Sequence, residues 1–331
     1  MTESENNIQR ITELKIHRRA VILAHNYQSP AIQDIADYMG DSLELSRRAA
    51  ATDAEVIVFC GVHFMAETAA ILNPGKTVLL PHPNAGCPMA DMITASDMIA
   101  IRQKHPGIPI VTYVNSSAAV KAESTVCCTS ANSVDVVHSF RDSRTVYMAP
   151  DRNLALYTAR HTDKEVLYWH GYCPIHHSLT AKDVLAKKEQ YPEALFIAHP
   201  ECRPEVIELA DEVRSTSGML RFVKESSRDS FIVGTERGIL YPMQKQNPDK
   251  KFYPASRKMI CPDMKKTTLP HVLRALETSQ PHLQQTRHHL AEVAVAMPQE
   301  LDVGCQQRLQ ATGEVREPQS VQPLDPHQRP A

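Results

Sequence analysis

The feature that most constrains the fold of this chain is a long internal repeat. Three apolar runs each end in a polar triplet: His25-Asn26-Tyr27, Tyr113-Val114-Asn115 and His199-Pro200-Glu201. The first residues of these triplets are almost equally spaced, since 113 − 25 = 88 and 199 − 113 = 86. A recurring pattern of this length indicates an internal repeat at the scale of a domain.

Two further markers recur with the same period. A hydroxyl residue lies 17 positions after the start of each triplet, at Ser42, Ser130 and Thr216. A Cys-Pro step follows about sixty positions after it, at Cys87 (87 − 25 = 62), Cys173 (173 − 113 = 60) and Cys261 (261 − 199 = 62). Of the 8 cysteines, these three are the ones followed by proline. Three independent markers with one period therefore support three copies of one unit.

Short apolar, β-branched runs alternate with helical patterns along the chain. We predict strands at residues 20–25, 55–62, 76–81, 108–115, 145–150, 165–170, 194–199, 211–216, 230–235 and 250–256. Unalternated apolar strands between helices are typical of buried parallel sheets. We therefore expect an α/β protein of three similar three-layer αβα domains, arranged around a pseudo-threefold axis with the active site at its centre.

The repeat period also predicts where the domains begin and end. We expect a first repeat with an N-terminal helix at 1–106, a second at 107–193 and a third at 194–270. A C-terminal helical segment that packs on the repeats is expected at 271–312. The last stretch, 313–331, is rich in Pro, Gln and charge without an apolar period, which predicts a disordered tail.

Composition excludes several classes of protein. Hydrophobic residues make up 42% of the chain and charged residues 22%, with a net charge of −2. This balance gives no reason to expect nucleic acid or an anionic membrane as partner, and no run approaches the roughly 18 apolar residues of a membrane span. The polar N-terminus lacks the apolar segment of a secretory signal. We expect a cytoplasmic protein whose cysteines are thiols or metal ligands rather than disulfides.

The triplets and hydroxyls are suited to binding a polar ligand. The outer residues of each triplet lie at i and i+2, so they project from one face at the carboxyl end of a strand, where α/β sheets bind their ligands. Each hydroxyl is expected to open a helix. Such a residue can be only an N-cap, or it can contribute with free backbone amides to an anion site. Three in register indicate one pocket for a substrate with several carboxylates or a phosphate.

Three converging thiolates would indicate a metal centre. Structural zinc usually takes four ligands, often in CxxC pairs, which this sequence lacks. Iron–sulfur clusters take thiolates, and a ligand cysteine is often followed by proline. Three ligands on a four-iron cluster would leave one iron open as a Lewis acid. The other cysteines are interpreted as small buried hydrophobic residues without an assigned role: Cys60, Cys127, Cys128, Cys202 and Cys305.

Three further residues are possible site residues. His176 lies three positions after Cys173 and has no counterpart in the other repeats. It could act in acid–base chemistry, contact a metal ligand or be an ordinary buried histidine. Glu67 and Glu236 are also possible, but their spacing does not distinguish them from ordinary helix and turn positions.

Several long motifs together resemble the quinolinate synthase family. They are AHNYQ (24–28), GDSLELS (40–46), FCGVHFMAETA (59–69), AGCPMADM (85–92), TYVNSSAAVKA (112–122), CCTSAN (127–132), HGYCPIH (170–176), AHPEC (198–202), STSGM (215–219), VGTERG (233–238) and CPDMKKTTL (261–269). The resemblance extends from about residue 8 to about residue 311.

The resemblance implies an enzyme of NAD biosynthesis. It implies condensation of iminoaspartate with dihydroxyacetone phosphate to quinolinate, phosphate and water, and a [4Fe–4S] cluster held by Cys87, Cys173 and Cys261. L-aspartate oxidase would be the supplier of the imine. The family's substrate-binding positions fall on His25, Ser42, Tyr113, Val114, Asn115, Ser130, His199, Pro200, Glu201 and Thr216. Tyr27 and His176 match further active-site positions.

We expect Tyr27, Tyr113, Glu201 and His176 to be the catalytic residues. Glu201 is the best candidate for a general base, because burial is expected to raise its pKa toward neutrality. Two other functions remain open. One is an iron–sulfur hydro-lyase acting on another polycarboxylate, and the other is a protein that uses its cluster as a sensor.

Overall fold

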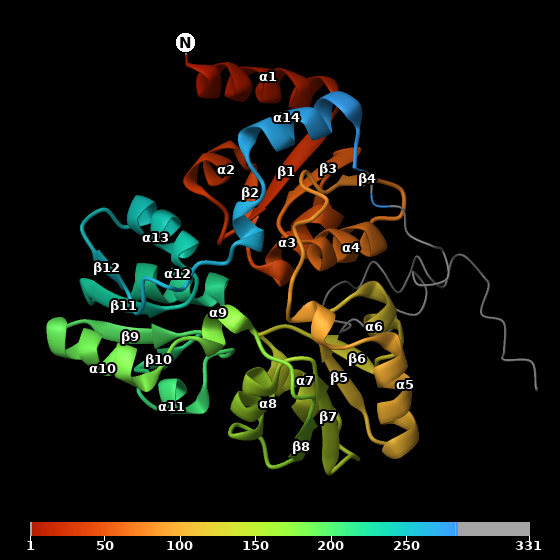
Figure 1. The fold of residues 1–331 in the computed structure, drawn as a ribbon, viewed down its shortest axis with the longest axis vertical. Helices are drawn as coiled ribbons and strands as arrows, with labels where there is room; N and C mark the ends of the chain where they lie inside the picture. The colour runs from red at the N-terminus through yellow and green to blue at the C-terminus, as the bar shows by residue number, and fades with distance from the viewer. Residues whose placement is uncertain (1, 282, 284–331) are drawn as a thin grey trace, which may run out of the picture. The chain divides into compact units, whose positions relative to one another are not determined.

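The fold contains three separate parallel sheets, each with four strands. The computed structural model describes residues 2–281 and 283. Within them the strand orders are β2-β1-β3-β4, β6-β5-β7-β8 and β10-β9-β11-β12, and Figure 1 shows each sheet with its own helices. The same order recurs three times, with the first strand of each repeat inside its sheet. The predicted α/β class and parallel sheets are confirmed.

The first sheet lies nearest the N-terminal helix. Its strands are β1 (Ala20–His25), β2 (Tyr38–Gly40), β3 (Val56–Cys60) and β4 (Thr77–Leu79). Its helical segments are α1 (Glu3–His17), α2 (Pro30–Ile35), α3 (Ser42–Ala51), α4 (His63–Leu72) and η1 (Ala90–Met92). Ile22, Leu23 and Ala24 of β1 are completely buried. Because helices cover both faces of such a sheet, the strand sequence shows no polar alternation.

The second sheet comprises β5 (Ile110–Tyr113), β6 (Val126–Cys128), β7 (Thr145–Ala149) and β8 (Glu165–Tyr168). Its helices are α5 (Ala95–Lys104), α6 (Ala118–Ala122), α7 (Ser133–Ser139) and α8 (Arg152–Ala159). The third sheet comprises β9 (Leu195–Ala198), β10 (Glu212–Val213), β11 (Ser230–Gly234) and β12 (Lys251–Pro254). The helical segments along it are α9 (Pro174–His177), α10 (Ala181–Gln190), α11 (Pro204–Ile207), α12 (Thr216–Glu225), η2 (Arg237–Ile239), α13 (Leu240–Gln246) and η3 (Asp263–Lys265).

All ten predicted strands are confirmed, with ends that differ by a few residues. Sequence analysis missed β2 and β6, which have three residues each. Such edge strands are too short to stand out as apolar runs in the sequence, and they form because the neighbouring strands β1 and β5 offer them backbone partners.

The last described helix returns to the first sheet. Helix α14 (Leu269–Thr278) buries Leu269 and Val272 in the same apolar cluster as Ile11 of α1 and Ile22 of β1. Figure 1 shows α1 and α14 side by side. The residues of the expected segment 271–312 beyond this helix and Leu283, and the whole expected tail 313–331, lie outside the described residues.

Each repeat ties its cysteine loop to its third strand by the same backbone hydrogen bond. In every repeat the N–H three residues after the end of that strand donates to the carbonyl two residues before the cysteine. The bonds are His63 N to Ala85 O (2.7 Å), Arg152 N to Gly171 O (2.8 Å) and Arg237 N to Met259 O (2.9 Å). The repeat therefore extends to the loops that carry Cys87, Cys173 and Cys261.

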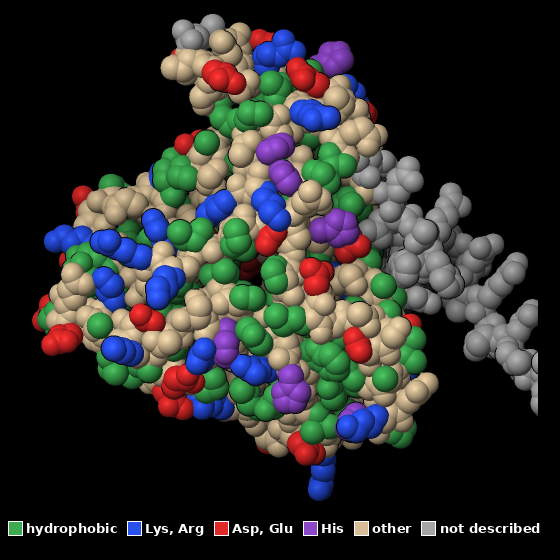
Figure 2. All heavy atoms as spheres, in the orientation of Figure 1, with side chains coloured by type: hydrophobic (Ala, Val, Ile, Leu, Met, Phe, Trp, Pro, Cys, Tyr) green, Lys and Arg blue, Asp and Glu red, His purple; other side chains and the backbone are tan. Residues whose placement is uncertain are grey.

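In the described residues, no helix combines the length and apolar character needed to cross a membrane. On the face shown in Figure 2, Lys and Arg side chains are interspersed with Asp and Glu. The charge on this face is mixed, in keeping with the net charge of −2.

Candidate active site

Residues from all three repeats line one cavity of about 200 Å³. His25 ends β1, Tyr113 ends β5 and His199 follows β9, so the triplets lie at the carboxyl ends of equivalent strands. The predicted site residues that line it are His25, Tyr27, Ser42, Cys87, Tyr113, Asn115, Ser130, Cys173, His176, His199, Glu201, Thr216 and Cys261. Residues more than 200 positions apart in sequence are thus brought to one site.

Two predicted substrate-binding residues do not line this cavity. The backbone N–H of Val114 donates to the carbonyl of Cys128 at 2.9 Å, and its side chain is buried. Pro200 lines a neighbouring hollow that also borders Ser130. Both are the middle residues of their triplets and lie just beyond the ends of β5 and β9.

The marker hydroxyls are not helix caps. Asp41 and Ser215 accept the capping hydrogen bonds at the starts of α3 and α12, from Glu44 N at 3.0 Å and Gly218 N at 3.3 Å. Ser42 and Thr216 are the first helical residues instead. Ser130 precedes α7 by three residues and does not open it, contrary to our expectation. Neighbouring residues provide the caps at α3 and α12, and both Ser42 and Thr216 line the cavity. Oγ1 of Thr216 accepts a hydrogen bond from Nδ2 of Asn26 at 3.3 Å, which leaves its O–H free to donate.

Two buried histidines have a fixed tautomer. The Nδ1 atom of His25 accepts the backbone N–H of Tyr27 at 3.1 Å, and Nδ1 of His199 accepts that of Glu201 at 3.3 Å. Burial lowers the pKa of His25 to about 4 and that of His199 to about 3. Both imidazoles are therefore neutral at pH 7, with the proton on Nε2, and can donate a hydrogen bond to a ligand.

These two histidines predict a loss of stability in mild acid. Between pH 6.5 and about 4 the unfolded chain binds a proton at each histidine and the folded protein does not, so the free energy of unfolding falls as the pH falls. From pH 7.5 to 5.5 each is expected to cost about 1.4 kcal/mol. Urea unfolding under anaerobic conditions measures this change, and His25→Gln should remove about half of it. Equal stability at the two pH values would contradict the prediction.

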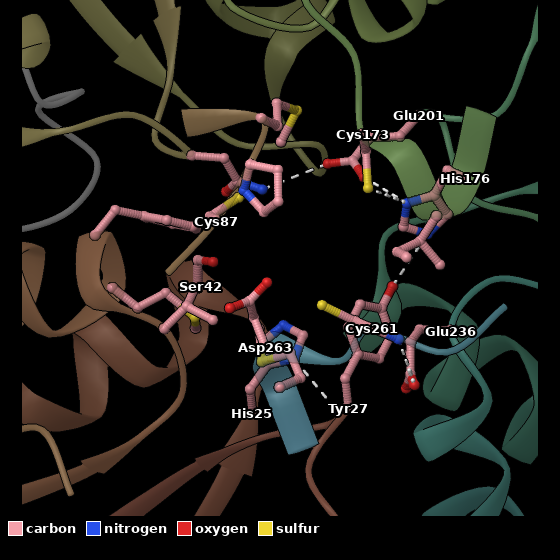
Figure 3. A pocket seen from close by; sticks show the side chains of 18 of the residues that line it. His25, Tyr27, Ser42, Cys87, Cys173, His176, Glu201, Glu236, Cys261 and Asp263 are labelled. Atoms are coloured by element: carbon pink, nitrogen blue, oxygen red, sulfur yellow. Dashed lines mark hydrogen bonds and ion pairs between the residues drawn. The ribbon is translucent and has the colours of Figure 1, made fainter. Parts of the chain in front are cut away.

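A chain of hydrogen bonds connects Tyr27 to Glu201. The hydroxyl of Tyr27 lies 2.5 Å from Oγ1 of Thr235, which lies 2.8 Å from Nε2 of His176. Nδ1 of His176 lies 2.6 Å from Oε2 of Glu201. Figure 3 shows Tyr27, His176 and Glu201 at the cavity wall. A proton can pass along such a chain, because Thr235 and His176 in its middle can each donate one hydrogen bond and accept another.

Sequence analysis missed Thr235, which is buried directly after β11. It lies in the VGTERG motif, but the equivalent residues of the other repeats are Gly61 and Pro150. Because neither of these carries a hydroxyl, the repeat gave no signal for it.

Glu201 is ionised, contrary to our expectation. Burial alone opposes ionisation, but the contact with His176 and the hydrogen bond from Tyr113 more than offset it, so the pKa of Glu201 falls from 4.5 to about 2. The expected rise toward neutrality was wrong, because sequence analysis had no imidazole to place 2.6 Å from the carboxylate. On its other side Glu201 accepts hydrogen bonds from the Tyr113 hydroxyl and from Nδ2 of Asn115, the latter at 3.4 Å.

The three Cys-Pro cysteines have their thiols in the cavity. Figure 3 shows Cys87, Cys173 and Cys261 around it, each from a different part of the chain. All three are free. Burial raises the pKa of Cys87 to about 12, and it also raises the pKa values of Cys173 and Cys261. Thiolates in such a site need a cation to offset the cost of burying their charge.

Among the residues that the structure describes, one group of side chains could hold a metal ion. The ligand atoms of Cys173, His176 and Glu201 all lie within 4.8 Å of one another. The other described cysteines, Cys60, Cys127, Cys128 and Cys202, are buried in the cores of the repeats and do not line the cavity. Cys305 lies outside the described residues.

Glu67 and Glu236, which sequence analysis named as possible site residues, lie in different places. Glu67 of α4 accepts the backbone N–H of Ala118 at 3.1 Å and does not line the cavity. Glu236 does line it, and its carboxylate accepts the backbone N–H of Cys261 at 3.2 Å.

The fold and the site together define an α/β protein with a buried centre of thiols, histidines and carboxylates that could hold metal. A family model described as quinolinate synthetase A protein matches residues 9–302. The chain therefore belongs to the quinolinate synthetase A family, as the resemblance in the sequence predicted.

Curated relatives agree with this assignment over most of their length. The quinolinate synthase of Thermodesulfovibrio yellowstonii is 54% identical over 274 residues, which is 82% of this chain and 90% of the relative. That of Methanosarcina barkeri is 55% identical over 273 residues, again 82% and 90%. That of Geobacter metallireducens is 55% identical over 276 residues, 83% of this chain and 90% of the relative.

Proposed function

We propose that this chain is a quinolinate synthase that forms quinolinate from iminoaspartate and dihydroxyacetone phosphate, with release of phosphate and water. The observation that carries the proposal is that three thiols and the outer residues of the three polar triplets line one cavity, in a chain that belongs to this family.

The cofactor of the proposed enzyme is one [4Fe–4S] cluster held by Cys87, Cys173 and Cys261. The residues fit this group, because three free thiols from three loops surround one buried space and each is followed by proline. When bound, the cluster would supply an iron with a free coordination position as a Lewis acid. His176 and Glu201 lie beside Cys173 in the same cavity.

Polar groups around the cavity would hold the substrates. The Nε2–H groups of His25 and His199 and the hydroxyls of Ser42, Ser130 and Thr216 are hydrogen-bond donors suited to carboxylate and phosphate oxygens. Oδ1 of Asn115 is buried and has no hydrogen-bond partner among the described residues. A buried amide oxygen of this kind is costly unless a ligand satisfies it. Val114 and Pro200 would contribute through their backbone.

Two tyrosines would handle protons at the substrate. Tyr27 can pass a proton through Thr235 to His176, and Glu201 stabilises the charged imidazole that results. Tyr113, which donates to Glu201, can return a proton on the other side of the cavity. Glu201 would therefore act by holding charge on His176 rather than as a base with a raised pKa.

We also propose how the domains are arranged, in which compartment the enzyme works and which enzyme supplies its imine substrate. The three sheets would be domains around a pseudo-threefold axis, with their strands divided near residues 106 and 193 and the third domain ending near 270. Helices α5 and α10 precede these boundaries but pack on the sheet that follows them. The enzyme would be cytoplasmic, its substrates small molecules, and L-aspartate oxidase would supply the unstable imine.

An assay of the anaerobically purified protein tests the function. We expect about four irons and four sulfides per chain, a brown protein, and quinolinate formed only when both substrates are present. A colourless, iron-free protein with full activity would contradict the cluster. Hydration or dehydration of another polycarboxylate without use of dihydroxyacetone phosphate would support a hydro-lyase instead, and a cluster with no turnover at all would support a sensor.

A further inference from the structure

Two repeats place a buried carboxylate at the same position behind their cysteine loops. Val62, Asp151 and Glu236 are equivalent, because each directly precedes the residue whose N–H bonds to its repeat's cysteine loop. Asp151 is 2% exposed and Glu236 is fully buried. Oδ2 of Asp151 accepts the backbone N–H of Cys173 at 3.0 Å, and Oε1 of Glu236 accepts that of Cys261 at 3.2 Å.

The second oxygen of each carboxylate is also occupied. Oδ1 of Asp151 accepts the N–H of Leu154 at 2.8 Å and caps α8. Oε2 of Glu236 accepts the N–H of Gly238 at 2.6 Å. A carboxylate bonded through both oxygens has little freedom to rotate. Each therefore connects the cysteine's backbone rigidly to the end of a strand.

The neighbouring packing leaves these loops little room. A Cβ atom on Gly171, two residues before Cys173, would lie 2.5 Å from the carbonyl oxygen of Pro150. At Glu236, Nζ of Lys265 forms an ion pair at 3.0 Å and also donates to the carbonyl of Tyr27. Glu236 thus connects the Cys261 loop with the segment that carries Tyr27.

The first repeat has a different arrangement. The side chain of Val62 has no hydrogen-bond acceptor. The carboxylate that contacts the Cys87 loop comes from the third repeat instead. The N–H of Gly86 donates to Oδ1 of Asp263 at 3.3 Å, and Asp263 lies two residues after Cys261. The Cys87 loop is therefore held by Asp263 of the Cys261 loop as well as by the backbone hydrogen bond from His63 N to Ala85 O.

We propose that Asp151 and Glu236 are positioning residues, each of which fixes the backbone of one metal-binding cysteine, Cys173 and Cys261 respectively. Changes to groups that orient metal ligands in this way typically cost about 10- to 100-fold in metal affinity or activity. The part of this inference that concerns iron rests on the proposed function, but the positioning of the thiols does not.

Selective variants test the positioning in the full-length protein. Asp151→Ser keeps an oxygen that can cap α8 but removes the contact with Cys173. Glu236→Gln leaves an amide N–H₂ facing Gly238 N, Cys261 N or Lys265. The metal-free protein is alkylated with iodoacetamide, and the rate at each cysteine is followed by peptide mass spectrometry. We expect several-fold faster labelling of Cys173 alone in Asp151→Ser and of Cys261 in Glu236→Gln.

The cluster provides a second measurement. In both variants the visible absorption is expected to bleach about 10-fold faster in the presence of a chelator than in the unchanged protein. Asp211→Asn is the matched control, since its carboxylate accepts the N–H of Phe196 at 2.7 Å but contacts no cysteine loop. Unchanged labelling, or equal acceleration at Cys87, Cys173 and Cys261, would overturn the proposal. A chain that binds no iron would refute the proposed function, and the labelling pattern would still decide this inference.

Discussion

Cys173→Ala is expected to yield a folded protein that has lost its iron–sulfur absorption and its quinolinate synthesis. Only two thiols would remain in the cavity, on loops from the first and third repeats. We expect activity to fall by roughly 100-fold or more, since changes to groups that merely orient a metal ligand already cost about 10- to 100-fold. Iron and sulfide content, the visible spectrum and quinolinate formation measure the effect.

The matched control is Cys60→Ala. Cys60 is completely buried at the end of β3 and does not line the cavity, so it acts as a small hydrophobic residue. This variant should keep a full cluster and near-normal turnover, even where it lowers thermal stability. Loss of the cluster in Cys60→Ala, or its retention in Cys173→Ala, would refute the ligand assignment.

Glu201→Gln is expected to abolish most turnover while the cluster remains. The substitution keeps the shape of the side chain but removes the negative charge 2.6 Å from Nδ1 of His176. Without that charge, His176 can no longer hold a proton received from Tyr27 through Thr235. Proton transfer of this kind typically contributes about 10²- to 10⁴-fold to a rate, and we expect a loss in kcat of that order.

The readouts for this variant separate chemistry from assembly. The visible spectrum and iron content should match those of the unchanged protein, because all three thiols are intact. Glu205→Gln is the control, since Glu205 is half exposed on α11 and pairs only loosely with Arg203, at 3.7 Å. Full activity in Glu201→Gln would exclude the proposed role, and loss of iron would mean that Glu201 itself binds metal.

The repeat made much of the fold and site predictable. Strands such as β1 and β5 are buried on both faces, and this burial requires a continuous apolar run, which a sequence displays directly. Residues of the repeat stand out at fixed positions. His25 is a polar residue at the end of an apolar run, and Cys87 is a cysteine followed by proline. The threefold spacing then identified which positions belong together.

The sequence could not predict interactions between side chains that are far apart in the chain. Thr235 meets Tyr27 across 208 residues, and Tyr27 meets His176 across 149. No local period encodes such a contact, because it depends on how complete sheets are placed. The ionised state of Glu201 depends on the same placement, since burial alone would have raised its pKa.

The sequence by itself determined the α/β class, the three sets of strands and the family. It also identified Cys87, Cys173 and Cys261 as the candidate metal ligands. These follow from local burial and from repetition, which leave a pattern in the order of residues. Only the tertiary structure decided which side chains share hydrogen bonds and protons at the cavity, and which carboxylates support Cys173 and Cys261. Hydrogen bonds and ion pairs act over about 3 Å, and only folding brings these groups that close.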